Sequence, residues 1–452
     1  MFTTYTWQDY CAAEDKHALL LSAVQAYKLS PEFTTALEAE AYFQGRNPSV
    51  AEKTVLRAGK LETRDDSGRR RRRTVLRDVV GNRIGSGFLF RFVTQQNQYL
   101  LSDGVILDSS DTKKRLGPDF DRRLELMGEK ALLHGVCWGW WDTDHLEVLP
   151  AADGPLSGCF ALADEMSGEA RLVVQFWQLE ERRPLYLRLF APEGVTLLRR
   201  DGKELVTEQP LRCYRLSERT FPDGTRVRRE ENWGGLLPVL PIYANAGRQS
   251  ELTPAIRAKI DAYDNILSDF ADNLDRANDV YWVLNNFGGT AEDVAETLEQ
   301  INRLKAVTAL SDGSGTTATA EPHTIEVPYA ARQAALSLLE RGLYRDYMAL
   351  DMDELTGGSL TNVAIRTAAA GLNLKADRYE WQVIRFMRSL LHLLGLPDDI
   401  IRFRRQAIAN ESETVADIAA MRQDIDHRTA LRLNPYIQEE EIDVLAGQGA
   451  KM

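Results

Sequence analysis

The stretch Pro254-Ala-Ile-Arg-Ala-Lys-Ile-Asp-Ala-Tyr-Asp-Asn-Ile-Leu-Ser268 begins a long amphipathic helix and decides the fold class. Pro254 suits the first turn of a helix. Apolar residues recur at steps of three and four and predict one buried stripe: Ile256, Ile260, Tyr263, Leu267, Phe270 and Leu274. Aspartates lie mostly off this stripe and predict a second, acidic face: Asp261, Asp264, Asp269, Asp272 and Asp275.

Two further helices are predicted beyond this one. A helix begins at Pro328 and carries Leu336, Leu339, Leu343 and Tyr347 on one side. The segment Asp351-Met-Asp-Glu-Leu-Thr-Gly-Gly-Ser359 is too polar and too rich in glycine to continue it. A long helix then carries one seam that predicts lengthwise packing against another helix: Ile365, Ala369, Leu372, Ala376, Tyr379, Val383, Phe386, Leu390 and Leu393.

Composition limits the class of protein. A chain of 452 residues with 44% hydrophobic residues predicts several compact regions with real cores. No apolar run is long enough to cross a membrane, and the first residues lack the pattern of a signal peptide. The formal net charge of −12 argues against a protein whose main task is to grip nucleic acid. Four widely spaced cysteines predict buried free thiols: Cys11, Cys137, Cys159 and Cys213.

The first 250 residues read as helices followed by strands. Residues 6–30 and 31–45 have helical patterning, and Phe120 to Leu133 form another helix. We expect strands at Phe88–Val93 and Tyr99–Leu101, two strand-like pieces separated by polar residues. From Gly135 to about Tyr243 the sequence predicts antiparallel β-structure. The fold class is therefore α+β.

No pattern indicates catalysis. The six histidines are not spaced for joint metal binding on one helix. Gly81, Gly85 and Gly87 match neither the phosphate loop nor the dinucleotide fingerprint, so a turn is the expected structure. Trp138, Trp140 and Trp141 are expected in a core or a subunit interface. We therefore predict neither an enzyme nor a bound cofactor or metal.

A run of five arginines is the sharpest charge feature: Arg69, Arg70, Arg71, Arg72 and Arg73. One interpretation is a basic contact with nucleic acid or phosphate. The other is a solvated loop that pairs with an acidic face of a neighbour.

The order of several motifs resembles the portal proteins of tailed bacteriophages, along nearly the whole chain. The similar segments are Ala41-Tyr-Phe-Gln-Gly-Arg-Asn47, Asn82-Arg-Ile84 with Gln98–Ile106, Ala131–Trp138, Leu237–Asn245 followed by Ile260–Ser268, Gly357–Ala364, and Ile425–Ile442. Leu360-Thr-Asn362 departs from the family, which has glycine there.

The resemblance implies a portal-like fold with named parts. These would be an α/β wing at 1–250, stem helices at 251–280 and 328–350, a small α/β clip at 281–327, a tunnel loop at 351–360, a long kinked channel helix at 361–395, and a helical C-terminal crown at 396–452. The function implied is a ring of about twelve copies at one capsid vertex, through which double-stranded DNA is packaged and ejected. The chain would assemble in the bacterial host cytoplasm and stay in the virion.

The resemblance also suggests candidate sites. Residues of the tunnel loop and long helix would face the channel, where carboxylates repel DNA and a few cations centre it: Asp351, Asp353, Glu354, Gly357, Gly358, Lys375 and Arg378. Lys375 and Arg378 could instead pair with carboxylates of the adjacent subunit. An acidic clip helix could dock the packaging motor, or simply be a solvated face: Glu292, Asp293, Glu296 and Glu299.

The implied partners are further copies of the chain, double-stranded DNA, the terminase large subunit, the major capsid and scaffolding proteins, and a head-completion adaptor; no membrane is implied. Two alternatives stay open. One is another ring protein of the head–tail junction, and the other is a nucleic-acid-processing enzyme that uses the arginine run.

Overall fold

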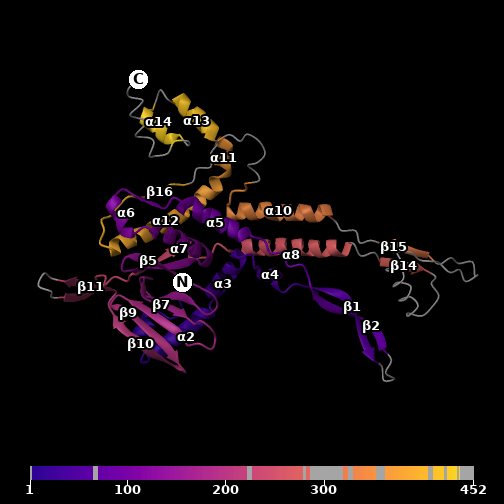
Figure 1. Cartoon of the computed structure of the whole chain (residues 1–452), viewed down its shortest axis with the longest axis horizontal. Coiled ribbons are helices and arrows are strands. Elements are labelled where there is room, and N and C mark those ends of the chain that lie inside the picture. Colours follow the sequence, from indigo (N-terminus) through magenta and orange to yellow (C-terminus); the bar gives the residue numbers. More distant parts are fainter. Residues whose placement is uncertain are drawn as a thin grey trace, which may run out of the picture. The chain divides into compact units, whose positions relative to one another are not determined.

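The structure is a computed structural model, and it describes residues 3–64, 70–220, 226–277, 281–285, 319–323, 329–352, 362–405, 411–421, 425–434 and 437. The chain divides into two compact units. Unit 1 comprises residues 1–46, 87–257 and 343–452, and unit 2 comprises residues 47–86 and 258–342. Helices and strands both contribute extensively, which confirms the α+β class (Figure 1).

One layer of unit 1 is a five-stranded antiparallel sheet in the order β10-β9-β8-β7-β6. Its strands are β6 (Gly158–Ala163), β7 (Ala170–Trp177), β8 (Tyr186–Ala191), β9 (Gly194–Asp201) and β10 (Glu204–Arg212). The N-terminal helices are α1 (Trp7–Ala12), α2 (Lys16–Lys28) and α3 (Pro31–Phe43). Tyr27 and Phe33 pack against Phe160 and Phe176 of the sheet, so these helices and strands share one core.

A second layer of unit 1 is a three-stranded antiparallel sheet in the order β13-β4-β5. Its strands are β4 (Val136–Asp142), β5 (His145–Pro150) and β13 (Val239–Tyr243). Helices α7 (Phe120–His134) and α12 (Ala370–Leu393) pack against it, and α5 (Phe88–Leu101) packs against α7 and α12. Trp138, Trp140 and Trp141 of β4 are buried, which confirms their predicted place in a core.

The long predicted seam is confirmed residue by residue. All nine of its positions are buried, from Ile365 and Ala369 to Leu390 and Leu393. The helix is in two pieces, α11 (Asn362–Ala368) and α12, with Ala369 between them. Burial of this one stripe from Ile365 to Leu393 requires packing neighbours along the whole helix.

Smaller elements complete unit 1. Strand β3 (Val105–Leu107) pairs with β16 (Ile401–Phe403), and β11 (Arg215–Thr220) pairs with β12 (Arg226–Glu231). The short helices are α6 (Ser110–Leu116), α13 (Glu411–Ala420) and α14 (His427–Leu433). Cys137 and Cys159 are buried free thiols as predicted, whereas Cys11 is exposed and Cys213 is only half-buried.

Unit 2 contains most of two long helices, α8 (Pro254–Ala277) and α10 (Tyr329–Tyr347), which lie side by side and run antiparallel (Figure 1). The ring centroids of Phe270 and Tyr329 are 5.6 Å apart, and Lys259 Nζ donates to the Gly342 carbonyl over 3.5 Å. Two antiparallel strand pairs belong to the same unit: β1 (Thr54–Arg64) with β2 (Arg70–Val80), and β14 (Tyr281–Asn285) with β15 (Thr319–His323). Helix α4 (Pro48–Ala51) precedes the first pair.

The predicted strands at Phe88–Val93 and Tyr99–Leu101 are wrong, because both lie in helix α5. Phe88, Phe90 and Phe92 recur at every second position, which suggests a strand. The buried positions instead recur in adjacent pairs, every three to four residues: Phe88, Leu89, Phe92, Val93, Gln96, Asn97, Leu100 and Leu101. A helix satisfies this longer pattern and leaves Phe90 half exposed.

Candidate functional site

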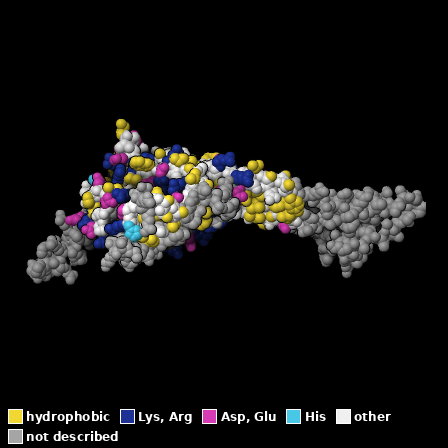
Figure 2. Space-filling model, turned by 90° about the horizontal axis from the view of Figure 1, so that it is seen from above, with side chains coloured by type: hydrophobic (Ala, Val, Ile, Leu, Met, Phe, Trp, Pro, Cys, Tyr) yellow, Lys and Arg dark blue, Asp and Glu magenta, His cyan; other side chains and the backbone are white. Residues whose placement is uncertain are grey.

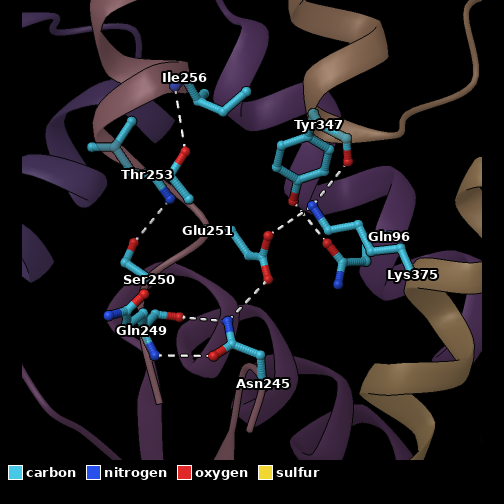
Figure 3. A network of polar contacts seen from close by, with 10 residues as sticks. Gln96, Asn245, Gln249, Ser250, Glu251, Thr253, Ile256, Tyr347 and Lys375 are labelled. Atoms are coloured by element: carbon cyan, nitrogen blue, oxygen red, sulfur yellow. Dashed lines mark hydrogen bonds and ion pairs between the residues drawn. The ribbon is translucent and has the colours of Figure 1, made fainter. Parts of the chain in front are cut away.

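The end of helix α10 is held by a network of buried polar side chains in unit 1 (Figure 3). Lys375 of α12 lies at its centre. Its Nζ is 2.7 Å from Glu251 Oε2, donates to the Tyr347 carbonyl over 3.0 Å, and lies 3.1 Å from the centre of the Tyr347 ring. Because α10 ends at Tyr347, this ammonium group satisfies a carbonyl that the helix cannot bond internally.

Two glutamines of α5 complete the attachment. Tyr347 Oη donates to Gln96 Oε1 over 2.8 Å. Gln95 bonds both backbone groups of Leu350: its Nε2 donates to the Leu350 carbonyl over 3.0 Å, and its Oε1 accepts the Leu350 N–H at 2.9 Å. Between them the chain turns at Met348, which has a positive φ of 64°. The turn is therefore fixed by side chains from α5 and α12 rather than by glycine.

Glu251 is positioned from the other side by a backbone turn. Its N–H donates to the Leu132 carbonyl over 2.9 Å, and Ser250 Oγ donates to the Leu133 carbonyl over 2.5 Å. Asn245 Nδ2 donates to Glu251 Oε1 over 3.4 Å (Figure 3). The carboxylate thus belongs to a rigid frame that includes α7, and it faces the Lys375 ammonium.

The Lys375–Glu251 pair is buried: the two side chains are 14% and 11% exposed. Burial lowers the pKa of Lys375, while the Glu251 carboxylate opposes that change. Beside the pair lies a cavity of about 300 Å³ that is also lined by Met348, Leu374 and Arg378. The charges of the pair compensate each other inside one subunit.

The predicted channel residues differ in their surroundings. The Lys375 ammonium pairs with Glu251 of the same chain, and its role as a cation facing a channel stays a prediction. Arg378, one turn further along α12, is exposed, and Asp351 is half-buried just after the end of α10. Asp353, Glu354, Gly357 and Gly358 lie outside the described residues.

The other predicted charges are described only in part. Glu292, Asp293, Glu296 and Glu299 lie outside the described residues, as does Arg69. The backbone of Arg70 to Arg73 belongs to strand β2, opposite Arg64, Thr63, Glu62 and Leu61 of β1. The arginine run is therefore mostly strand rather than loop.

A second polar cluster lies in unit 2, on helix α8. The buried positions in the middle of this helix are polar, one turn apart: Asp264, Ser268 and Asp272 are 0%, 0% and 3% exposed. The predicted apolar stripe is buried only at Ile256 and Ile260. Two aspartates of the predicted acidic face, Asp264 and Asp272, are therefore buried.

The segment 81–87, in which we predicted a turn around three glycines, covers this polar face as an extended strap. Asp264 Oδ1 accepts the Ser86 N–H at 2.9 Å, and Ser268 Oγ accepts the Ile84 N–H at 3.1 Å. Asp272 Oδ1 accepts the Asn82 N–H at 2.8 Å. Asp264 also accepts a hydrogen bond from the Asn47 side chain. Four residues along helix α8 and two residues along the extended strap cover a similar distance. Successive hydrogen bonds therefore form between them like the rungs of a ladder.

The spacing of these residues in the sequence could have predicted the ladder of hydrogen bonds. Asp264, Ser268 and Asp272 are spaced by four and therefore share one helix face, while Asn82, Ile84 and Ser86 alternate in an extended segment. Burial raises the pKa of Asp264, and hydrogen bonds from Asn47 and Ser86 oppose that change. Gly81 permits the close approach, because a Cβ there would lie 2.9 Å from Asp272 Oδ2.

No catalytic or metal site emerges from the described part of the chain. Across the described ranges, His, Cys, Asp and Glu side chains never gather in threes where they could hold a metal ion. None of the described helices has the length and apolar character needed to cross a membrane.

Comparison with known proteins decides the family. The family model described as phage portal protein, SPP1 Gp6-like, matches residues 32–451. The chain belongs to this family of phage portal proteins. This confirms the resemblance seen in the sequence, and the family is one of ring-forming structural proteins of the virion.

Two curated relatives are both named portal proteins. The chain is 28% identical to the portal protein of Clostridium phage phiCD119 over 213 residues, which are 45% of this chain and 46% of that protein. It is 24% identical to the portal protein of Bacillus phage SPP1 over 398 residues, which are 80% of this chain and 75% of that protein. The first alignment therefore spans less than half of the relative's length.

Proposed function

We propose that this chain forms a ring of about twelve copies at one capsid vertex, and that double-stranded DNA enters and leaves the head through this ring. The observation that carries the proposal is the family match over residues 32–451. The protein would act as a structural conduit rather than as an enzyme, and ATP hydrolysis would belong to a separate motor.

The two long helices of unit 2 support a stem. On helix α10, Leu338 is 70% exposed and Tyr329 is 50% exposed. Figure 2 shows hydrophobic side chains gathered near the end of the described part of this unit. Apolar side chains exposed along a helix are typical of a surface that a further copy covers. The antiparallel pair of β14 and β15 lies between the two helices in the sequence, where the clip is proposed.

The tunnel loop is proposed at 351–360, between the end of α10 and the start of α11. The network around Lys375 supports this proposal, because it fixes the point at which the chain leaves α10. The proposed partners are the terminase large subunit, the major capsid and scaffolding proteins, and a head-completion adaptor. The acidic residues of the clip are proposed to dock the motor.

Imaging of the purified chain tests the proposal most directly. Negative-stain electron microscopy should show rings with a central hole wide enough for a duplex about 20 Å across, and light scattering should give the mass of about a dozen copies. A protein that stays a compact dimer at every salt concentration, and is absent from the vertex of assembled heads, would refute it.

A further inference from the structure

One face of helix α12 remains uncovered within the described chain, directly opposite its buried seam. Its exposed positions recur at steps of four and three, and we name them the outer stripe: Leu374, Arg378, Trp381, Arg385, Arg388 and His392. Trp381 is 66% exposed and Leu374 is 57% exposed. An exposed tryptophan flanked by arginines has the composition of a protein–protein interface.

The cations of the outer stripe are not used inside the subunit. Among the described residues, Arg378, Arg385 and Arg388 form no ion pair. The carboxylates of Asp377 and Glu380 on α12 do not pair with these arginines, because both bind Arg405. The stripe therefore presents three positive charges around one large aromatic ring.

A complementary surface lies between α7 and β5, where there is a hollow of about 530 Å³. Its lining has four carboxylates and two arginines, so it is acidic on balance: Asp119, Arg122, Arg123, Glu125, Leu126, Glu129, Glu147 and Val148. One of these arginines is already paired, because Arg123 Nη1 lies 3.9 Å from Glu147 Oε1. Leu126 is 47% exposed, and neither Glu125 nor Glu129 forms an ion pair with a residue that the structure describes. Burial raises the pKa of Glu129; Lys130 opposes the change, and the neighbouring Glu40 and Glu125 add to it. An added cation would relieve this crowding of carboxylates.

The two surfaces lie toward opposite edges of the same sheet. The strand order β13-β4-β5 puts β13 at one edge and β5 at the other. Helix α12 packs on β13, and a groove at that edge is lined by Leu240 of β13 together with Arg385 and His392. The hollow is at the β5 edge. Unlike surfaces toward opposite edges suit a head-to-tail contact between copies, whereas a twofold contact would need each surface to complement itself.

We propose that the outer stripe of α12 in one copy docks into the α7–β5 hollow of the next copy. Trp381 would contact Leu126, and Arg385 and Arg388 would pair with Glu125 and Glu129. The inference rests on the proposed ring and assigns the surfaces that join its subunits. The alternative occupant of the stripe is DNA. A large apolar ring exposed among the cations favours a permanent protein contact, because base stacking and apolar contact would hinder a duplex that must slide.

Cross-linking tests the pairing directly. In a background carrying Cys11→Ser and Cys213→Ser, the variant Trp381→Cys/Leu126→Cys should give a ladder of covalent oligomers with a short bismaleimide. Each single variant should give none, because only a head-to-tail contact brings position 381 of one copy to position 126 of another. A ladder that is absent although rings are present would overturn the proposal.

Charge reversal supplies the second test. Arg385→Glu/Arg388→Glu and, separately, Glu125→Arg/Glu129→Arg should each lower the fraction of protein in rings by about tenfold or more, because like charges would meet. Combining all four substitutions in one chain should restore rings. Arg182→Glu, a matched change at an exposed loop of unit 1, should leave the ring fraction unchanged.

The outcomes separate this proposal from the proposed function. If the wild-type chain forms rings that no charge reversal weakens, the assignment of these two surfaces is overturned, whereas the proposed ring is supported. If the arginine variant keeps its rings but binds a double-stranded oligonucleotide several-fold more weakly, the stripe faces DNA and the proposal is overturned. If the wild-type chain forms no ring in solution or in heads, the proposed function itself fails.

Discussion

The ammonium group of Lys375 lies 2.7 Å from the carboxylate of Glu251, and both side chains are buried. The pair joins helix α12 to the segment before α8, and through the Tyr347 carbonyl it also holds the end of α10. Three parts of unit 1 that are distant in the sequence therefore depend on one buried ion pair. Truncating either partner should leave a buried charge with no compensation.

Replacing Lys375 by alanine is expected to lower the free energy of unfolding by about 3–5 kcal/mol. The double variant Lys375→Met/Glu251→Gln should recover most of this loss, because neither buried charge remains. Chemical denaturation followed by circular dichroism would measure both. As a matched control, Lys114→Ala removes an ion pair whose partners are 78% and 91% exposed, and it should change stability very little. Equal losses for both lysines would contradict the prediction.

The strap over α8 predicts an unusual sensitivity at one glycine. A Cβ at Gly81 would lie 2.9 Å from Asp272 Oδ2 and 3.1 Å from Val55 Cγ1, so Asp272 would have to leave Asn82. Gly81→Ala is therefore expected to cost about 1–3 kcal/mol of stability, the typical penalty of an unsatisfied buried group. Gly87→Ala is the control, because no atom lies within 4 Å of its added Cβ. Thermal unfolding should shift for the first variant only.

Removing an acceptor of the ladder should have a comparable effect. Ser268→Ala deletes the oxygen that accepts the Ile84 N–H at 3.1 Å, and the site is fully buried. We expect faster exchange of the Ile84 amide hydrogen and a loss of about 1–3 kcal/mol. Exchange that is unchanged at residues 82–86 would show that the strap does not depend on this helix face.

Sequence reasoning located the long elements and missed the polar contacts, for a physical reason. The seam of α12 was predicted completely because burial of apolar residues at helical spacing leaves a periodic trace. The spacing of Asp264 and Asp272 predicts an acidic helix face but not their burial, because their partners include backbone N–H groups that carry no signature in the sequence. Glu251 was overlooked because the Lys375 that it binds is 124 residues away along the chain.

A short segment can fit both the two-residue period of a strand and the longer period of a helix, and the strand predicted at 88–93 is such a case. Phe88, Phe90 and Phe92 fit a strand, but Leu89 and Val93 fit only a helix with a broad buried face. Glycine gave a weaker guide still: the three glycines of 81–87 suggested a turn, whereas the segment is an extended strap. The family resemblance rested on motif order, which survives such local errors because it does not depend on the secondary structure assigned to each motif.

A buried histidine should make unit 1 less stable in mild acid. His134 is 1% exposed, its Nε2 lies 2.8 Å from Glu40 Oε1, and its Nδ1 has no partner among the described residues. This arrangement fits a neutral imidazole that donates from Nε2. Burial lowers the pKa of His134, and the hydrogen bond to Glu40 opposes that change. Because the unfolded chain takes up the proton more readily, stability should fall as pH decreases below about 6.5.

The variant His134→Gln should flatten this part of the stability curve, measured by urea unfolding between pH 7.5 and pH 5. His145→Gln is an informative comparison, since hydrogen bonds to Asp144 and Glu147 raise the pKa of His145 and its contribution is lost as pH rises instead. Glu40 affects the pH dependence of stability in a more acidic range. Burial opposes its ionisation, but hydrogen bonds from His134 and Lys130 outweigh burial and lower its pKa to about 2. Its contribution is present above about pH 4.5 and is lost as pH falls toward 2.

The proposed tunnel loop gives a prediction about DNA movement. Asp353 and Glu354 follow the point where Gln95 and Lys375 fix the end of α10, and we propose that their carboxylates keep DNA phosphates from adhering. Reversing both charges with Asp353→Lys/Glu354→Lys should slow packaging several-fold without preventing ring assembly. The measurement is the length of DNA packaged over time in a reconstituted reaction, with ring formation followed by light scattering.

Two comparisons make that experiment decisive. Asp353→Asn/Glu354→Gln removes the repulsion without adding attraction, so it should slow packaging less than the lysine variant does. Raising the salt concentration should restore part of the rate in the lysine variant, because screening weakens the attraction between exposed charges. Packaging at the wild-type rate in both variants would show that these two carboxylates do not meet the DNA, and the tunnel loop would then have to be sought in another part of the chain.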